Sequence, residues 1–216
     1  MNDEWRLGPN HRTIQTSCKG VGGRQGQRPW REGWLDRFLG QLAAESSVLD
    51  VGCGSGNPIA RYLLSSGCRV TGVDASAELL TMCRAKFPDQ RWLEIDMRTL
   101  SFGQRFDGIL AWDSFFHLSH DDQRKMFPIF RDHSAPGGSL LFTSGPSHGV
   151  AMGEYGCESL YHASLDRVEY QSLLEANDFE VTAHVAEDVL QQPYRVARTS
   201  AITSMPQILR SAFVPK

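Results

Sequence analysis

Residues 48–60 read VLDVGCGSGNPIA, an apolar run with one acid that leads into glycines at every second position. Glycine loses more backbone freedom on folding than any other residue, so a loop of alternating glycines is conformationally costly. Because glycine has no Cβ, such a loop can turn sharply and approach a bound molecule closely. The stretch therefore predicts a buried strand, a ligand-binding loop, and a helix whose first turn holds Pro58.

The rest of the chain alternates between strand-like and helix-like segments. Short apolar runs predict strands at residues 47–51, 69–74, 91–96, 106–112, 139–145 and 179–185. Helical periodicity or helix-capping residues occupy the intervals between them, with helix starts predicted at Ser76, Ser119 and Asp166. Strands that alternate with helices indicate βαβ units, so we expect an α/β fold with a doubly wound, mainly parallel sheet.

Composition is that of an ordinary globular domain. The 216 residues are 41% hydrophobic and 22% charged, with a formal net charge of −3. That charge and the lack of a long basic or apolar run argue against a nucleic-acid or membrane partner. Five cysteines without a CxxC pair favour reduced thiols and a cytoplasmic location. Residues 1–29 are polar and glycine-rich, which predicts a flexible arm before a single domain at 30–216.

Acidic residues mark the ends of the predicted strands. Asp74 ends the second strand about twenty residues after the glycine loop, and Asp96 follows the third. In doubly wound sheets ligands bind beyond the carboxyl ends of the strands, and an acid at the position of Asp74 is typical of ribose binding. A nucleoside cofactor is therefore expected at this edge.

The glycine spacing argues against a dinucleotide. The fingerprint GxGxxG would need a glycine at position 57 or 59, where the chain has Asn57 and Ile59. An NAD(P)-dependent oxidoreductase is therefore the weaker alternative.

The segment Asp50-Val51-Gly52-Cys53-Gly54-Ser55-Gly56 resembles motif I, DxGxGxG, of the class I S-adenosylmethionine-dependent methyltransferases. The resemblance extends over residues 30–185, with FDGILAWDSFFHL (106–118) and PGGSLLFTSG (136–145) similar to the fourth and fifth strands of that family. It implies a Rossmann-like sheet of seven strands, the last of which is antiparallel. Residues 195–202 are the candidate for that last strand, which we expect to be atypical because its apolar period is weak.

The resemblance also implies a binding role for particular residues. Asp50 would orient the methionine amine, Asp74 would accept from the ribose hydroxyls, and Asp96 would accept from the adenine amino group. The full set of implied cofactor-binding residues is Asp50, Gly52, Cys53, Gly54, Asp74, Ala75, Asp96, Met97, Ala111 and Trp112.

The sequence gives less specific evidence about which residues bind the methyl acceptor. His117 is the candidate general base, although a histidine bonded to a loop carbonyl beneath the following helix is the somewhat more frequent arrangement. The long segment at about 145–162 is expected to be a loop that faces the substrate. Candidate substrate-binding residues are Trp30, Phe115, Phe116, His148, Tyr161 and His162. No metal is expected, because Asp121 and Asp122 suit the start of a helix.

Together these features predict transfer of a methyl group from S-adenosyl-L-methionine to a hydroxyl or amine of a small molecule. The basic residues of the arm leave other acceptors open, but nucleic acid is not the expected one. A non-catalytic protein that binds S-adenosylmethionine or S-adenosylhomocysteine would carry the same motifs and is the main alternative. A monomer or a homodimer is expected.

Overall fold

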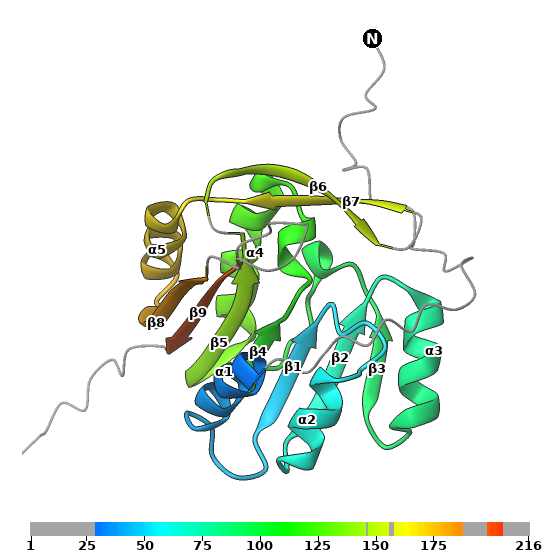
Figure 1. The fold of residues 1–216 in the computed structure, drawn as a ribbon. Helices are drawn as coiled ribbons and strands as arrows, with labels where there is room; N and C mark the ends of the chain where they lie inside the picture. The colour runs from blue at the N-terminus through cyan, green and yellow to red at the C-terminus, as the bar shows by residue number, and fades with distance from the viewer. Residues whose placement is uncertain (1–28, 146, 156–157, 188–197, 205–216) are drawn as a thin grey trace, which may run out of the picture.

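The computed structural model describes residues 29–145, 147–155, 158–187 and 198–204. A seven-stranded sheet forms its centre (Figure 1). From edge to edge the strands are β3 (Arg91–Glu94), β2 (Arg69–Asp74), β1 (Ser47–Val51), β4 (Phe106–Ala111), β5 (Ser134–Ser144), β9 (Arg198–Ser204) and β8 (Glu180–Glu187). The first five are parallel, and β9 pairs antiparallel with both of its neighbours, which confirms the predicted mainly parallel sheet.

The strand order reverses between β1 and β4, and this reversal locates the site. β1 lies between β2 and β4, so that Leu49 pairs with Thr71 on one side and with Ile109 on the other. A crevice opens at the carboxyl ends of the strands wherever a doubly wound sheet changes direction in this way. The glycine loop follows β1 directly at that point.

Helices cover both faces of the sheet (Figure 1). One layer holds α1 (Pro29–Leu39), α2 (Ile59–Ser65) and α3 (Ala77–Lys86), and the other holds α4 (His120–His133) and α5 (Arg167–Ala176). In β1, Leu49 and Val51 point into the core beneath α4 and α5, whereas Val48 points into the core beneath α1 to α3. No helix in the described ranges is both long and apolar enough to cross a membrane.

The predicted helix starts are confirmed by side-chain caps. Ser76 accepts from the N–H of Leu79, Ser119 from that of Asp122, and Asp166 from that of Glu169. Each cap satisfies one of the N–H groups that the first turn of a helix leaves without a partner.

The last strand corrects one expectation. β9 overlaps the predicted range 195–202 and lies between β5 and β8, which is the ordinary antiparallel place in this fold, so it is not atypical. Side-chain periodicity is a poor guide here, because pairing on both sides satisfies the backbone of a strand whatever its side chains.

The segment predicted as a loop at about 145–162 is largely a β-hairpin instead. Strands β6 (Gly149–Tyr155) and β7 (Glu158–Ser164) pair antiparallel and form a separate two-stranded sheet. In Figure 1 the hairpin crosses above the carboxyl ends of the central strands. β7 packs on the short helical turn η2 (Phe115–His117), so the hairpin covers the residues that follow β4.

Buried polar side chains of the α4/α5 layer hold the base of the hairpin. The Nε2 of Gln123 donates to the carbonyl of Ala163, and the Tyr170 hydroxyl donates to Gln123 Oε1 at 2.6 Å. The N–H of Leu165 donates to the same Tyr170 hydroxyl at 3.1 Å. The place of the hairpin therefore depends on a hydrogen-bond network within the core.

Tyr170→Phe tests this anchor. The change leaves the Gln123 side chain and the Leu165 N–H buried without these partners, so we expect the free energy of unfolding to fall by about 2 kcal/mol. Urea denaturation measures it. Tyr62→Phe is the control, because the Tyr62 hydroxyl bonds to Asp36 at an exposed position and should matter by less than about 1 kcal/mol. Equal losses in the two variants would contradict the anchor.

Candidate active site

The glycine loop is pinned to the end of β2. The N–H groups of Gly52 and Cys53 both donate to the carbonyl of Val73, at 2.8 and 3.0 Å. Gly52 has φ +73°, and a Cβ added there would lie 2.3 Å from the Cβ of Ser114. Only glycine fits this position, because both the conformation and the space exclude a side chain.

Gly54 is different, because its surroundings are open. It has φ +56°, and no heavy atom lies within 4 Å of the place where a Cβ would be. The open side of Gly54 therefore lies at the crevice between β1 and its neighbours, where a ligand can approach the backbone.

Asp74 joins the loop to the end of β2. Its Oδ2 accepts from the Gly54 N–H at 2.8 Å, and its Oδ1 accepts from the Ser76 N–H at 2.9 Å. An ionised carboxylate has about four acceptor positions, so both oxygens retain capacity for further donors. Asp74 thus shapes the loop in addition to any bond that it makes to a ligand.

Asp50 is a buried carboxylate with an unused oxygen. It is only 2% exposed, and its Oδ2 has no hydrogen-bond partner among the described residues. Burial, together with the charge of Asp74, raises the pKa of Asp50 to about 7. Buried polar atoms nearly always have partners, so an unpaired carboxylate oxygen beside an open loop indicates a site for a donor, and most of all for a cation.

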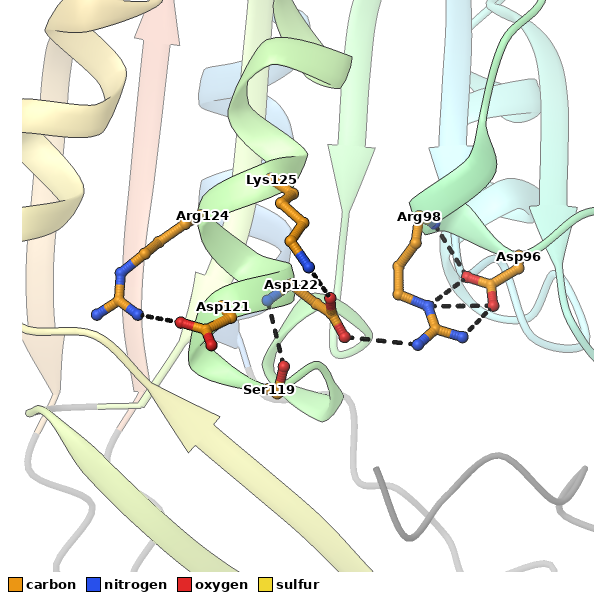
Figure 2. A network of polar contacts seen from close by, with 7 residues as sticks. All are labelled: Asp96, Arg98, Ser119, Asp121, Asp122, Arg124 and Lys125. Carbon is orange, nitrogen blue, oxygen red and sulfur yellow. Dashed lines mark hydrogen bonds and ion pairs between the residues drawn. The ribbon is translucent and has the colours of Figure 1, made fainter. Parts of the chain in front are cut away.

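The third acid, Asp96, is held by an arginine that the sequence analysis did not single out (Figure 2). The Nε of Arg98 lies 2.9 and 3.1 Å from the two carboxylate oxygens of Asp96, and its Nη1 lies 3.4 Å from Asp122 on α4. Asp96 also accepts from the N–H of Arg98 and so begins the short turn η1 (Met97–Thr99). Met97 reaches back to the loop, because its Cε would lie 3.3 Å from a Cβ on Gly52.

His117 bonds to a carbonyl of the hairpin and packs against two aromatic rings. Its Nδ1 lies 3.0 Å from the carbonyl of Tyr161, and its ring packs against those of Phe116 and His162 at 4.7 and 4.9 Å. Since a carbonyl can only accept, Nδ1 carries the proton, and in neutral imidazole Nε2 is then the basic nitrogen. The contact that could make His117 structural is thus also one that would orient a base.

The structure brings together some of the predicted acceptor residues and separates others. Phe116, together with Tyr161 and His162 of β7, gathers around His117 where the hairpin packs on η2. Phe115 is not among them and the prediction for it is wrong. It is fully buried and packs edge-on against Phe127 and Phe142 in the core, because the η2 turn directs it under the sheet.

The remaining predicted residues are scattered around this centre. His148 is exposed and stacks on His120 at 4.5 Å, and Ala75 is exposed beside Asp74. Cys53, Ala111 and Trp112 are buried. Trp30 lies in α1, and its side chain is outside the described residues, as are most of residues 1–29. In the described ranges no three His, Cys, Asp or Glu side chains are grouped so as to hold a metal ion.

Cys53 has a neighbour that the sequence did not predict. A hydrogen bond with Cys83 and burial raise the pKa of the Cys53 thiol, so it stays protonated. Cys83 Sγ also contacts the carbonyl of Gly54 at 3.2 Å. The two thiols therefore pack the underside of the loop.

Sequence reasoning missed Ser114, Arg98 and Gln123. Ser114 fills the space against Gly52 and donates to the carbonyl of Val51 at 2.6 Å. In the sequence these three residues are marked only by their closeness to predicted site residues. Their roles depend on contacts with other strands or loops, which a local pattern does not show.

Comparison with known proteins agrees with this architecture. Residues 48–138 match the methyltransferase domain family. Malonyl-[acyl-carrier protein] O-methyltransferase of Enterobacter lignolyticus (strain SCF1) is 30% identical over 116 residues, which cover 50% of this chain and 43% of that protein. Trans-aconitate 2-methyltransferase of Azoarcus sp. (strain BH72) is 34% identical over 96 residues, which cover 44% of this chain and 37% of that protein.

A solved structure extends the likeness beyond the matched segment. The structure of CalS10, an amino pentose methyltransferase from Micromonospora echinaspora with S-adenosylmethionine bound, has a TM-score of 0.63 at 18% identity. It covers 83% of this chain and 92% of that one. The chain therefore has the fold of the class I S-adenosylmethionine-dependent methyltransferases, and the sequence match to the methyltransferase domain family is confined to residues 48–138. The matched segments span less than half the length of the two sequence relatives.

The raised pKa of Asp50 predicts how stability depends on pH. The pKa of about 7 in the folded protein exceeds the ordinary aspartate value of 3.8, so the folded state holds the proton more tightly. The free energy of unfolding should therefore fall as pH rises from about 4 to about 7, by up to about 4 kcal/mol from this group. Asp50→Asn removes the buried charge and should raise the free energy of unfolding at pH 8 by on the order of 2 kcal/mol. The increase is smaller than the full effect of the charge because the buried amide is itself left without a hydrogen-bond partner.

Urea denaturation at pH 4, 6 and 8 measures this gain, which should shrink toward pH 4. Asp107→Asn is the control, because the Asp107 carboxylate accepts from Ser47 N–H and hydroxyl, both at 2.8 Å, and should gain nothing. A loss of stability in Asp50→Asn at pH 8 would contradict an unpaired buried charge.

Proposed function

We propose that this protein transfers the methyl group of S-adenosylmethionine to an oxygen or nitrogen atom of a small molecule. The observation that carries the proposal is the unpaired, buried carboxylate oxygen of Asp50 at the end of β1, where the chain enters the glycine loop with its open position at Gly54. A cationic group of a ligand would give that carboxylate oxygen a hydrogen-bond donor and a compensating charge. The α-ammonium of S-adenosylmethionine is such a group. The cofactor supplies a methyl group on a positively charged sulfur.

The residues at the strand ends fit the rest of this cofactor. Asp74 retains acceptor capacity for the ribose hydroxyls. Asp96 and the Met97 N–H, the first of the η1 turn, would serve the adenine edge as acceptor and donor. Arg98 would keep the Asp96 carboxylate oriented, because its guanidinium contacts both oxygens. The N–H groups of Gly52, Cys53, Gly54 and Gly56 all donate to acceptors within the protein, which speaks against a pyrophosphate held by the loop amides and hence against a dinucleotide.

A small acceptor is supported by the hairpin and by the relatives. Two of the proteins described above are named for small acceptors, trans-aconitate and an amino pentose. In this chain β6 and β7 cover the residues after β4, so an acceptor would meet His117 and Phe116 beneath the hairpin and His162 on β7 itself. Enclosure of this kind excludes water and aligns an acceptor, which is most of what methyl transfer from a sulfonium requires.

His117 would act as the general base when the acceptor is a hydroxyl or a protonated amine. The carbonyl of Tyr161 accepts from Nδ1, which orients the ring and stabilises the imidazolium that forms when Nε2 takes the proton. Tyr161 and His162 would contact the bound acceptor and would not take part in the proton transfer.

Cofactor binding can be tested without knowing the acceptor. Isothermal titration calorimetry should show binding of S-adenosylhomocysteine and none of NAD or NADP. Gly54→Ala should lose at least tenfold in affinity, because the added methyl group occupies the open side of the loop. Gly67→Ala is the control, since Gly67 also has a positive φ (+87°) and open surroundings but lies after α2.

Both variants should lose a similar stability, about 1 kcal/mol, from the strained conformation. Only Gly54→Ala should lose affinity. Binding of NAD by the parent protein, without binding of S-adenosylhomocysteine, would refute the proposed function.

His117→Asn separates the two roles of the histidine. Asparagine can still donate to the Tyr161 carbonyl from about the position of Nδ1, but it has no basic nitrogen. On an acceptor found by screening small carboxylic acids and amino sugars, we expect kcat to fall at least a hundredfold while S-adenosylhomocysteine affinity stays unchanged. The acidic limb of the pH–rate profile should also disappear. A kcat within threefold of the parent value would make His117 structural.

A further inference from the structure

Trp112, directly after β4, carries a second buried polar group without a partner. Its side chain is 5% exposed, and its indole Nε1 has no hydrogen-bond acceptor among the described residues. Another buried tryptophan behaves as expected, since Trp92 Nε1 donates to the carbonyl of Phe87 at 2.9 Å. An indole N–H is a donor only, so a buried and unpaired one costs about 1–3 kcal/mol unless a ligand accepts from it.

Trp112 and Asp50 face the same side of the sheet at neighbouring strand ends. Asp50 pairs with Leu110 in the register of β1 and β4, and Trp112 follows two residues later. Leu110 and Trp112 both belong to the core beneath α1 to α3, as does Val48, which is two residues before Asp50 in β1. Side chains two residues apart in a strand share a face, so the two unpaired groups are diagonal neighbours.

The two groups have opposite hydrogen-bonding character. Ionised Asp50 can only accept, and the Trp112 indole can only donate. They do not bond to each other, because neither Asp50 Oδ2 nor Trp112 Nε1 has a partner. A ligand that satisfies both must present a donor and an acceptor close together, which is what the ammonium and carboxylate of an α-amino acid offer.

We propose that Trp112 is a specificity residue for the amino-acid end of the cofactor, in which its indole N–H donates to the carboxylate while Asp50 holds the ammonium. The inference rests on the proposed function, because S-adenosylmethionine is the ligand that ends in an α-amino acid. A nucleoside without the carboxylate would leave the indole N–H buried and unpaired, so the site would discriminate against it.

The test compares S-adenosylhomocysteine with its decarboxylated analogue by isothermal titration calorimetry. The parent protein should bind S-adenosylhomocysteine at least tenfold more tightly than the analogue, since a hydrogen bond to a charged group is lost. Trp112→Phe keeps the ring and removes the N–H. It should bind the analogue as the parent does and prefer S-adenosylhomocysteine by less than threefold.

Trp92→Phe is the matched control, because it removes an indole N–H that bonds within the protein. It should keep the parent preference. If Trp112→Phe also keeps it, or loses affinity equally for both ligands, the proposal is overturned. If the parent protein binds neither ligand, the proposed function fails instead.

A spectroscopic measurement on the parent protein keeps the proposal testable if Trp112→Phe does not fold. In ¹H–¹⁵N spectra, one indole N–H signal should move downfield on addition of S-adenosylhomocysteine and not on addition of the decarboxylated analogue. Identical indole spectra with the two ligands would overturn the proposal.

Discussion

Three backbone N–H groups of the glycine loop donate to the end of β2, and the rest of the site depends on this contact. Gly52 and Cys53 donate to the carbonyl of Val73, and Gly54 donates to the carboxylate of Asp74. These bonds hold the loop in left-handed conformations that only glycine adopts without strain. The loop therefore leaves β1 in a single direction, with the open side of Gly54 at the switch point of the sheet.

The same edge of the sheet holds polar groups that folding alone leaves unsatisfied. Asp50 and Trp112 are almost fully buried, yet one oxygen and one N–H have no partner among the described residues. Each costs stability, and the raised pKa of Asp50 reflects the cost of the carboxylate. Buried polar groups without partners are rare in proteins and are found mostly at functional sites, where a ligand supplies the missing hydrogen bonds. Unpaired groups therefore indicate a binding site more directly than well-bonded groups do.

The region around His117, where we propose that the acceptor binds, depends on contacts between distant segments. β7 packs on η2, while Gln123 and Tyr170 fix the base of the hairpin from the helices beneath. Arg98 likewise links the loop after β3 to α4 through Asp96 and Asp122 (Figure 2). Phe115 and Phe116, both predicted to bind the substrate, are separated for the same reason. The turn after β4 directs Phe115 into the core and leaves Phe116 beside His162.

Local patterns in the sequence were sufficient for the fold and for the acidic residues at the carboxyl ends of the strands. Strand–helix alternation, capping residues and the glycine spacing act within a few residues, so they predicted the parallel sheet, the helix starts at Ser119 and Asp166, and the acids at the strand ends. The hairpin, the place of β9, the partner of Asp96 and the shared face of Asp50 and Trp112 came only from the tertiary structure. Each of these depends on strand register or on contacts between segments far apart in the chain, and nothing in a local pattern specifies which distant residue will meet it.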